Sequence, residues 1–431
     1  CFATDSLTTD NNEVHIGDVL NTIQNQDLVT QTRPTPNDGM LSYLNFAVAT
    51  NPEIAALYEA EKIARSRIDS AMAQMRPQLS ASSAVGGYTD DISNVSVERG
   101  TSVSLTVSQL VFDGGKTSSS VSEAELGLAL AQASTLTAVN RVSAEAANAG
   151  VALMIALEDL TAIRQFQKEL KPHVSQLELM AQSGMIDRSV LDEVSGRLLE
   201  IDIAEQEASA ALSIAKLDFS KNFGDLELPN SVFALLETLE TLLSDRLSAK
   251  EAPKVREALL RVMIAERELA RAKSAFLPTI NAQANSSSPM DPNENMNAQV
   301  GVMLTYQLGD GGSRKANLEG AKARLEQNKR SALFEVENIE TVLNSLDEKL
   351  NSTENLLKLA NKKLKVLVGQ LSVAEKQIQT GQADVAKVFD IKLKLNEIDG
   401  RIRRSKADLA KTKIQKAAVL GLFSQLLVES E

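Results

Sequence analysis

The chain repeats its own pattern of glycines, prolines and aspartates at a nearly fixed distance. The matched pairs are Asp113 with Asp310, Gly114 with Gly311, Gly115 with Gly312, Gly184 with Gly381 and Gly224 with Gly421, each 197 residues apart. Upstream, Pro52 and Pro77 match Pro253 and Pro278 at an interval of 201 residues. The interval changes only between Pro77 and Asp113. A period near 200 residues is much longer than that of solenoid repeats, so we expect one large structural unit present twice.

The composition is typical of long helices that pack on one another. Aromatic residues make up 3% of the 431 residues and there is no Trp. The net charge is −12, and no basic cluster follows the chain, so nucleic acid is not an expected partner. One Cys and two His exclude an internal disulfide and argue against a zinc site. We find no catalytic triad, phosphate loop or metal-ligand spacing, and therefore expect neither an enzyme nor a cofactor.

The first residues suggest a lipid anchor. Cys1 is the only cysteine, and a chain that begins with it looks like a mature lipoprotein, so we expect Cys1 to carry lipid. The alternative is a chain boundary that falls there by chance. Residues 2–40 are rich in Asn, Thr, Asp and Pro, which predicts an irregular arm. No run of 18 apolar residues occurs, so we expect no transmembrane helix.

Each repeat is expected to begin with a helix and continue as a β-hairpin. The helices, 41–76 and 253–277, end where a residue precedes proline and leaves the helical region. The apolar period then changes from 3.6 to 2. The alternating apolar residues are Val103, Leu105 and Val107 in the first repeat, and Val300, Val302, Leu304, Tyr306 and Leu308 in the second. We expect hairpins over 79–112 and 279–308, with strands near the ~10 residues that a membrane strand needs. A half-buried soluble hairpin is the alternative.

Asp-Gly-Gly follows each hairpin. Glycine permits positive φ, and Asp accepts hydrogen bonds from free N–H groups where a helix begins. Because the motif occurs twice after an alternating strand, we expect Asp113, Gly114 and Gly115, and likewise Asp310, Gly311 and Gly312, to form strand-to-helix turns.

Two long helical hairpins complete the repeats. About 70 residues separate each of these turns from Gly184 and Gly381, enough for a helix of roughly 100 Å. The apolar residues follow a heptad-like spacing of alternately three and four residues. In the first repeat, one position of this spacing holds the polar Gln167 in place of an apolar residue. These residues are Leu160, Ile163, Leu170, Val174, Leu177 and Ala181, then Leu191, Val194, Leu198 and Ile201; and Leu357, Ala360, Leu364, Leu367, Leu371, Ala374 and Ile378, then Val388, Ile391, Leu395, Ile398 and Ile402. This predicts two antiparallel coiled-coil hairpins with a Gly at each tip.

Four strands do not close a barrel, and lipid does not tolerate open sheet edges. The smallest membrane barrels have about 8 strands, so at least two chains must contribute, and three leave room for a passage. The order of these duplicated motifs over residues 41–424 resembles the TolC family of outer-membrane factors. This resemblance implies a mainly α fold with a small β part, in which a trimeric barrel of 12 strands continues as an α-helical barrel.

The same resemblance implies a function and partners. It implies an exit duct in the outer membrane of a Gram-negative bacterium, extending into the periplasm and docking to a periplasmic adaptor and an inner-membrane ABC or RND transporter. It assigns adaptor docking to the tips at Gly184 and Gly381. The family often has two acidic residues, three apart, after the second Gly; here the matching positions hold Lys387 and Asp390. We expect Asp390, with Lys387 and Arg188, at the periplasmic gate.

The expected organisation follows from these boundaries. It is an arm at 1–40, a first repeat at 41–224, a linker at 225–252, a second repeat at 253–424 and a tail at 425–431. The compact start of the first repeat resembles the type I protein-secretion members of the family more than the drug-efflux ones, which implies type I protein secretion. A lipidated Cys1 is similar to efflux members and implies the alternative, an outer-membrane lipoprotein of a multidrug RND efflux pump. A periplasmic coiled-coil adaptor fits less well, because it would show one hairpin within β-rich sequence.

Overall fold

The computed structural model describes residues 33–88, 98–232, 234–244, 248–289, 295–379 and 385–429; Cys1 and Gly381 lie outside these ranges. The chain forms two compact units. One, here called the tip unit, comprises 1–55, 136–253 and 338–431, and the other, the sheet unit, comprises 56–135 and 254–337. Each unit takes segments from both sequence repeats. The repeats are therefore units of sequence and secondary structure. Each compact unit, by contrast, is formed by the corresponding segments of both repeats packing together.

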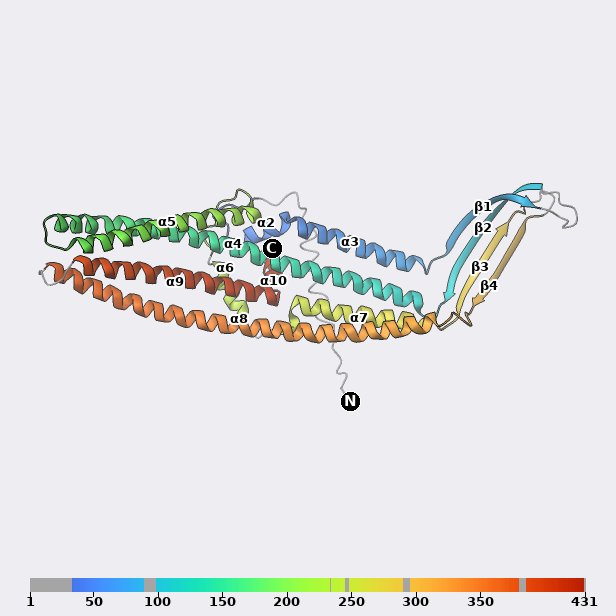
Figure 1. The fold of residues 1–431 in the computed structure, drawn as a ribbon. Helices are drawn as coiled ribbons and strands as arrows, with labels where there is room; N and C mark the ends of the chain where they lie inside the picture. Colours follow the sequence, from blue (N-terminus) through green and yellow to red (C-terminus); the bar gives the residue numbers. More distant parts are fainter. Residues whose placement is uncertain are drawn as a thin grey trace, which may run out of the picture. The chain divides into compact units, whose positions relative to one another are not determined.

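The sheet unit contains one four-stranded antiparallel sheet in the order β1-β2-β3-β4 (Figure 1). Its strands are β1 (Gln78–Tyr88), β2 (Glu98–Phe112), β3 (Thr279–Ser287) and β4 (Asn297–Thr305). Each repeat supplies one hairpin, as expected, and β2 pairs with β3 to join the hairpins. The last strand ends at Thr305, before the Tyr306 and Leu308 that the alternation had included.

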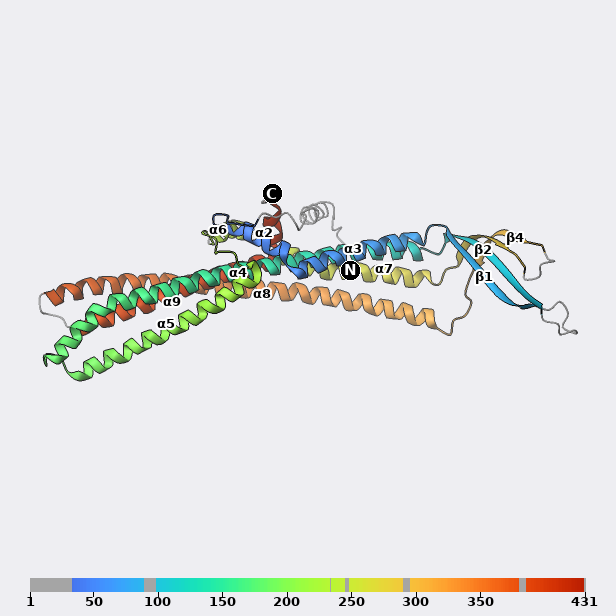
Figure 2. The ribbon, with the colours of Figure 1, turned by 90° about the horizontal axis from the view of Figure 1, so that it is seen from above.

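Corresponding helices of the two repeats have the same number of residues. The first long helices, α4 (Lys116–Gln182) and α8 (Ser313–Gln379), have 67 residues each, and the returning helices, α5 (Arg188–Phe223) and α9 (Val385–Leu420), have 36 each. The helices before the strands, α3 (Pro52–Ala73) and α7 (Pro253–Ser274), have 22 each. In both views α5 returns beside α4 and α9 beside α8 (Figures 1 and 2). The two predicted helical hairpins are present.

The first helix differs from the expectation. In place of one helix over 41–76 the chain forms two, α2 (Met40–Thr50) and α3, which are separated at Asn51, and α3 ends at Ala73, before the expected Arg76. The Asn51 Oδ1 atom accepts hydrogen bonds from the N–H groups of Glu53 at 2.9 Å and Ile54 at 3.3 Å, and Pro52 needs no N–H partner at the first helical position. A new helix therefore begins at Pro52, inside the range that was expected to form one helix.

The tip unit has an aromatic core near the end of α5. The ring of Tyr43 packs edge-on against Phe223 at 5.6 Å, and Phe219 lies 4.6 Å from Phe223. The expected linker at 225–252 contains α6 (Ala234–Ser244) and a 3₁₀ turn (Ala249–Glu251). The expected tail is largely helical too, because α10 (Leu422–Glu429) buries apolar side chains such as Leu426.

The apolar seams of the helical hairpins follow the heptad spacing with one exception. Seam residues of the second repeat, such as Leu367 and Ile398, pack together as expected. In the first repeat Phe166 is buried instead of Gln167, whose side-chain N–H donates to Asp202 Oδ1 at 3.0 Å. The larger apolar side chain occupies the core, and its polar neighbour takes the edge.

One described helix, α4, is long and apolar enough to cross a membrane by length and composition alone. The sequence analysis predicted no such helix, because its criterion was an uninterrupted apolar run. Of the most apolar 18-residue window, 39% is buried within the protein. Buried Ala and Val residues of α4, among them Ala146 and Val151, give this stretch its apolar character. A single helix of this kind is weak support for a membrane span.

Candidate functional site

The sheet sorts its side chains into two chemically different faces. Successive side chains of a strand point to opposite faces, and residues in direct register share one. One face, here called the polar face, carries mainly hydroxyl and amide side chains, with Ala84, Leu110 and Met303 among its apolar members. Three successive rows of it are Ser82–Ser104–Ser287–Asn297, Ser80–Thr106–Asn285–Gln299 and Gln78–Ser108–Gln283–Gly301.

The opposite face, here called the apolar face, carries mainly aliphatic side chains. Its rows include Leu79–Val107–Ala284–Val300 and Ala81–Leu105–Ser286–Ala298. Leu79 is 69% exposed and Val300 is 88% exposed, so the chain itself provides no cover for them. Aliphatic side chains at this exposure are stable where the surroundings are apolar, as in lipid, with the polar face toward water.

The strands hold few charges. Glu98 and Arg99, at the start of β2, are the only Asp, Glu, Lys or Arg residues in β1–β4. The rows of the polar face are therefore neutral over three successive levels. A passage lined by this face interacts with solutes through hydrogen bonds rather than through fixed charge.

The two Asp-Gly-Gly turns form as the sequence predicts. Asp113 accepts the N–H of Gly115 at 3.0 Å and the N–H of Thr117 at 2.7 Å. Asp310 accepts the N–H of Gly312 at 3.0 Å and that of Arg314 at 2.8 Å. These hydrogen bonds satisfy free donors at the beginnings of α4 and α8.

The glycines of these turns adopt positive φ angles. The values are +68° and +86° for Gly114 and Gly115, and +64° and +92° for Gly311 and Gly312. Glycine reaches this region without steric cost. The backbone N–H of Arg314, and after it the Arg314 guanidinium, hold the pKa of Asp310 below its usual range. Both carboxylates thus fix the direction in which a long helix leaves its strand.

The first helical tip reverses at Gly184, which has a φ of +72°. The Met185 N–H donates to Met180 O at 2.9 Å, and the Gly184 N–H to Ala181 O at 3.1 Å, a common way to end a helix. Asp187 then caps α5 by accepting the Ser189 N–H at 2.8 Å. A Cβ on Gly184 would meet no atom within 4 Å, so the tip leaves open space there.

The residues expected at the gate lie near the start of the returning helices. Asp390 is 40% exposed and pairs with Lys394 at 2.6 Å and, across to α5, with Arg197 at 3.8 Å. Lys387 and Arg188 are exposed. Among the described residues, Asp390 has Arg197 and not Arg188 as its partner on the first helical hairpin. The role of Asp390, Lys387 and Arg188 at a periplasmic gate stays a prediction.

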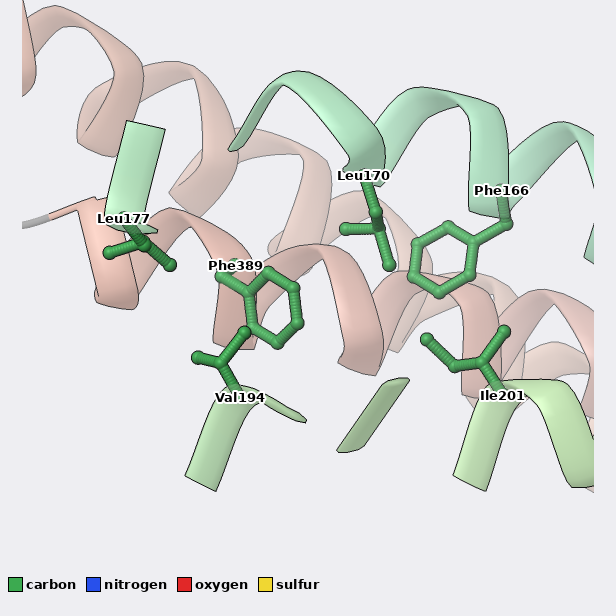
Figure 3. Packing of buried hydrophobic residues seen from close by; sticks show 6 residues of the cluster. All are labelled: Phe166, Leu170, Leu177, Val194, Ile201 and Phe389. Atoms are coloured by element: carbon green, nitrogen blue, oxygen red, sulfur yellow. The ribbon is translucent and has the colours of Figure 1, made fainter. Parts of the chain in front are cut away.

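The burial of Phe389 was not predicted from the sequence. This side chain of the second repeat is 2% exposed and lies within a cluster whose other buried members come from the first repeat (Figure 3). Leu177 and Val194 lie beside its ring, and Phe166, Leu170 and Ile201 continue the cluster. The heptad spacing identifies Val388 and Ile391, which pack against the partner helix α8. It does not predict that Phe389, which lies between them in the sequence, is buried.

Polar contacts join the same helices. The Arg403 Nε atom lies 2.6 Å from Asp159 Oδ1, which connects α9 to α4 in a half-buried setting. His173 of α4 has its pKa lowered by burial and by Lys392 of α9, while Glu375 of α8 opposes this effect. The Arg403–Asp159 pair and Phe389 hold the two helical hairpins to one another within the tip unit.

Comparisons with known proteins agree with this geometry. The family model described as outer membrane efflux protein matches residues 246–412. No curated protein sequence matches the chain. Among solved structures, CusC, whose crystal structures concern folding and transmembrane channel formation, superposes with a TM-score of 0.77 at 15% identity, covering 90% of this chain and 98% of that one.

This chain has the fold of the TolC-type outer-membrane factors. Two further structures share that fold. The outer membrane protein VceC of Vibrio cholerae gives a TM-score of 0.75 at 15% identity, over 89% of this chain and 96% of that one. The open-state MtrE outer membrane channel of Neisseria gonorrhoeae gives 0.69 at 16% identity, over 90% and 89%. The matching family model and the solved structures are described as outer-membrane proteins or channels.

Proposed function

We propose that the protein is the outer-membrane exit duct of a tripartite export system, and that three copies form one channel. The main support is the sheet, which sorts an apolar face from a neutral polar face and leaves β1 and β4 each with a single neighbour. Lipid does not accommodate open edges, so copies of this sheet close on one another. The polar faces then line a water-filled passage, which is a conduit and performs no chemistry.

The channel activity is tested with purified protein in planar bilayers. We expect single-channel steps with a stable conductance, because a closed barrel with a polar interior conducts ions. The absence of conductance from correctly folded, inserted protein contradicts the proposal.

The partners follow from the same proposal. The duct receives its cargo from an inner-membrane ABC or RND transporter through a periplasmic adaptor. We propose that the tips at Gly184 and Gly381 bind the adaptor. Gly184→Trp and Gly381→Trp change the space at the tips without touching the sheet. We expect both to reduce crosslinking to the adaptor while conductance stays normal, and unchanged crosslinking and export would remove the docking role.

The proposed cargo is a protein, carried by type I secretion. A second candidate, small-molecule efflux, is favoured by the description of the family model as outer membrane efflux protein. Deletion of the gene distinguishes them. Loss of a secreted protein from the culture medium supports the first, and increased sensitivity to toxic compounds with normal secretion supports the second.

We propose that Asp390, with Lys387 and Arg188 nearby, sets the ionic character of the periplasmic entrance. Asp390 and Lys394 form an i,i+4 pair that corresponds in the first repeat to Glu193 and Arg197, which pair at 3.0 Å. Arg197 therefore lies between acidic groups of both repeats. We expect Asp390→Ala to change conductance and reduce cation preference, with Glu193→Ala as the matched control. Unchanged conductance and selectivity in Asp390→Ala would show that the gate lies elsewhere.

A further inference from the structure

One edge of the sheet is where all four strands meet the helices of the sheet unit (Figure 1). Gln78 begins β1 and Phe112 ends β2 at this edge, and Thr279, which begins β3, lies opposite Thr305, which ends β4. Four segments connect these strand ends to α3, α4, α7 and α8, and together they are here called the junction. They are residues 74–77, 113–118, 273–278 and 306–315.

The junction is basic, whereas the chain as a whole is acidic. It holds five basic and two acidic residues, a net charge of +3, in a chain with a net charge of −12. The residues between the strands of each hairpin, 89–97 and 288–296, contain four acidic residues and no basic one. Positive charge is therefore a property of the junction and not of the hairpins in general.

Four of the five cations of the junction are exposed and form no ion pair within the part of the chain that the structure describes. These four, here called the junction cations, are Arg76, Lys116, Lys273 and Lys315. The fifth, Arg314, binds Asp310 at 2.9 Å. Glu319 lies near Lys315 but pairs with Lys322 at 2.9 Å. The positive charge of the junction cations is thus not neutralised by an ion pair.

Two junction cations occupy the end of a helix that disfavours positive charge. Lys116 is the first residue of α4, and Lys315 is the third residue of α8. The N-terminus of a helix carries partial positive charge, so a cation there is destabilising unless an anion lies close by. The aspartate of each turn already accepts backbone N–H groups of the helix. An anion from outside the chain would supply the counter-charge at both helices.

The junction cations are not copies of one another made by the duplication. Their repeat equivalents are the uncharged residues Leu277, Ser313, Met72 and Ser118. Each of the four connecting segments nevertheless contains at least one cation. Charge that occurs at unrelated positions along the whole edge favours a partner that extends along the edge, as a layer of lipid headgroups does, over a ligand bound at one point.

Exposed apolar side chains lie beside these cations. Phe112 lies opposite Ile280 at the helix end of the apolar face and is 44% exposed. Met75 and Phe276 are exposed apolar residues of the junction itself. Each of Phe112, Met75 and Phe276 lies within four residues of a junction cation in the sequence. Apolar or aromatic side chains next to cations, at the end of an apolar face, are typical of the boundary between acyl chains and headgroups.

We propose that the junction binds anionic phospholipid headgroups of the bilayer leaflet on the helix side of the sheet. The junction cations donate charge-assisted hydrogen bonds to phosphate oxygens, while Phe112 and its apolar neighbours contact the acyl boundary. An anionic headgroup is preferred to a zwitterionic one, because only the anionic headgroup carries uncompensated negative charge. This inference rests on the proposed function, which puts the apolar face in lipid, and it names the class of lipid that the channel binds on this side.

The lipid preference of the reconstituted channel tests this proposal. The wild-type protein is placed in phosphatidylcholine bilayers, and the association of spin-labelled phosphatidylglycerol with the protein is compared with that of spin-labelled phosphatidylcholine. We expect a preference for phosphatidylglycerol of about fivefold where one lipid contacts one cation. The preference should decrease as the salt concentration rises, because salt screens the attraction.

Two variants of equal net charge locate the preference. The junction variant replaces the four junction cations with glutamine, and the control variant replaces four exposed lysines of α8 in the tip unit. The substitutions are Arg76→Gln, Lys116→Gln, Lys273→Gln and Lys315→Gln in the first, and Lys358→Gln, Lys362→Gln, Lys363→Gln and Lys365→Gln in the second. The junction variant should lose the preference and the control variant should keep it. Equal preference in the two variants overturns the proposal.

Conductance in phosphatidylcholine bilayers shows whether each variant inserts. If the junction variant does not insert, Arg76→Gln with Lys273→Gln replaces it, and an undiminished preference in that double variant contradicts the proposal. Inorganic phosphate is also compared with chloride at equal ionic strength, and loss of the preference in phosphate alone would make the occupant a free phosphate ion instead of a lipid. Wild-type protein that conducts without a lipid preference refutes the lipid site alone, whereas inserted protein without conductance refutes the proposed function.

Discussion

The two repeats have helices of equal length but unequal surroundings. Leu136 of α4 is 7% exposed, whereas Leu333, its equivalent in α8, is 66% exposed. The turn at Gly114 packs on Leu277, whereas the turn at Gly311 is open. Within one chain, these residues of the first repeat are covered, whereas the equivalent residues of the second repeat are left exposed. A duplicated chain with one filled and one empty contact is suited to assembly with copies of itself.

The tips show the same inequality. Phe389 of the second repeat is buried within the first helical hairpin, while the equivalent position of the first repeat holds the exposed Asp192. The duplication therefore preserved lengths and turns, whereas substitutions gave each repeat its own contacts.

The largest effect is expected from charge on the apolar face of the sheet. Val107→Asp puts a carboxylate into lipid in every copy. A Lys or Arg on a lipid-facing strand position costs about 2–4 kcal/mol near the bilayer midplane, and an Asp costs somewhat less. We expect loss of the assembled form from the outer-membrane fraction. The measurement is membrane fractionation followed by unheated gel electrophoresis.

Thr106→Asp is the control for that variant, one residue away on the polar face. It should assemble normally and increase cation preference, because it adds carboxylates to a passage without fixed charge. If both variants assemble equally well, the assignment of the two faces is wrong.

The next largest effect concerns Phe389. Truncation of a buried Phe typically costs about 3–5 kcal/mol, so Phe389→Ala should lower the thermal stability of the tip unit and increase proteolysis near the tips. The repeat equivalent, Asp192→Ala, removes an exposed side chain and should leave both unchanged. Equal melting temperatures for the two variants contradict the packing seen in Figure 3.

A pair of glycine variants should separate folding from assembly. Both Gly114→Ala and Gly311→Ala place a Cβ at positive φ, at roughly 1–2 kcal/mol each. Gly114→Ala also clashes with Leu277 inside the chain, for about 1–3 kcal/mol more, and should lower the yield of folded protein. Gly311→Ala should lower the fraction of trimer without that loss of yield. Identical behaviour of the two variants in both assays removes the proposed difference between the turns.

The smallest expected effect is a dependence of stability on pH at His173. Burial and Lys392 lower its pKa, so the folded protein favours the neutral imidazole. The unfolded chain then binds more protons in acid, and stability is complete above the ordinary pKa of about 6.5 and declines below it. His173→Gln introduces the residue that the second repeat has at Gln370 and should flatten the decline between pH 7 and pH 5. A thermal unfolding series at several pH values checks this, and an unchanged slope contradicts it.

Local chemistry made much of the fold predictable. Proline and glycine mark the ends of α3, α4 and α7, and the two Asp-Gly-Gly turns and the Gly184 tip were placed correctly because each depends on a few adjacent residues. The heptad spacing predicted which residues pack within each helical hairpin, since such packing depends on one shared period.

Contacts between distant segments were not predictable in the same way. Phe389 lies outside the heptad seam and is buried only because another hairpin surrounds it. The pairing of Asp390 with Arg197 likewise depends on how two hairpins meet. The alternation through Leu308 indicates a strand that the single chain does not complete. The roles of Gly184, Gly381, Lys387 and Arg188 remain proposals that rest on the outer-membrane-factor fold.

The central claim is that one chain forms one third of a closed channel. Light scattering of the protein purified in mild detergent, with the detergent contribution subtracted, measures this directly. We predict a protein mass of three times the 46.5 kDa of one chain, stable on dilution. A stable, folded monomer under the same conditions would contradict the account.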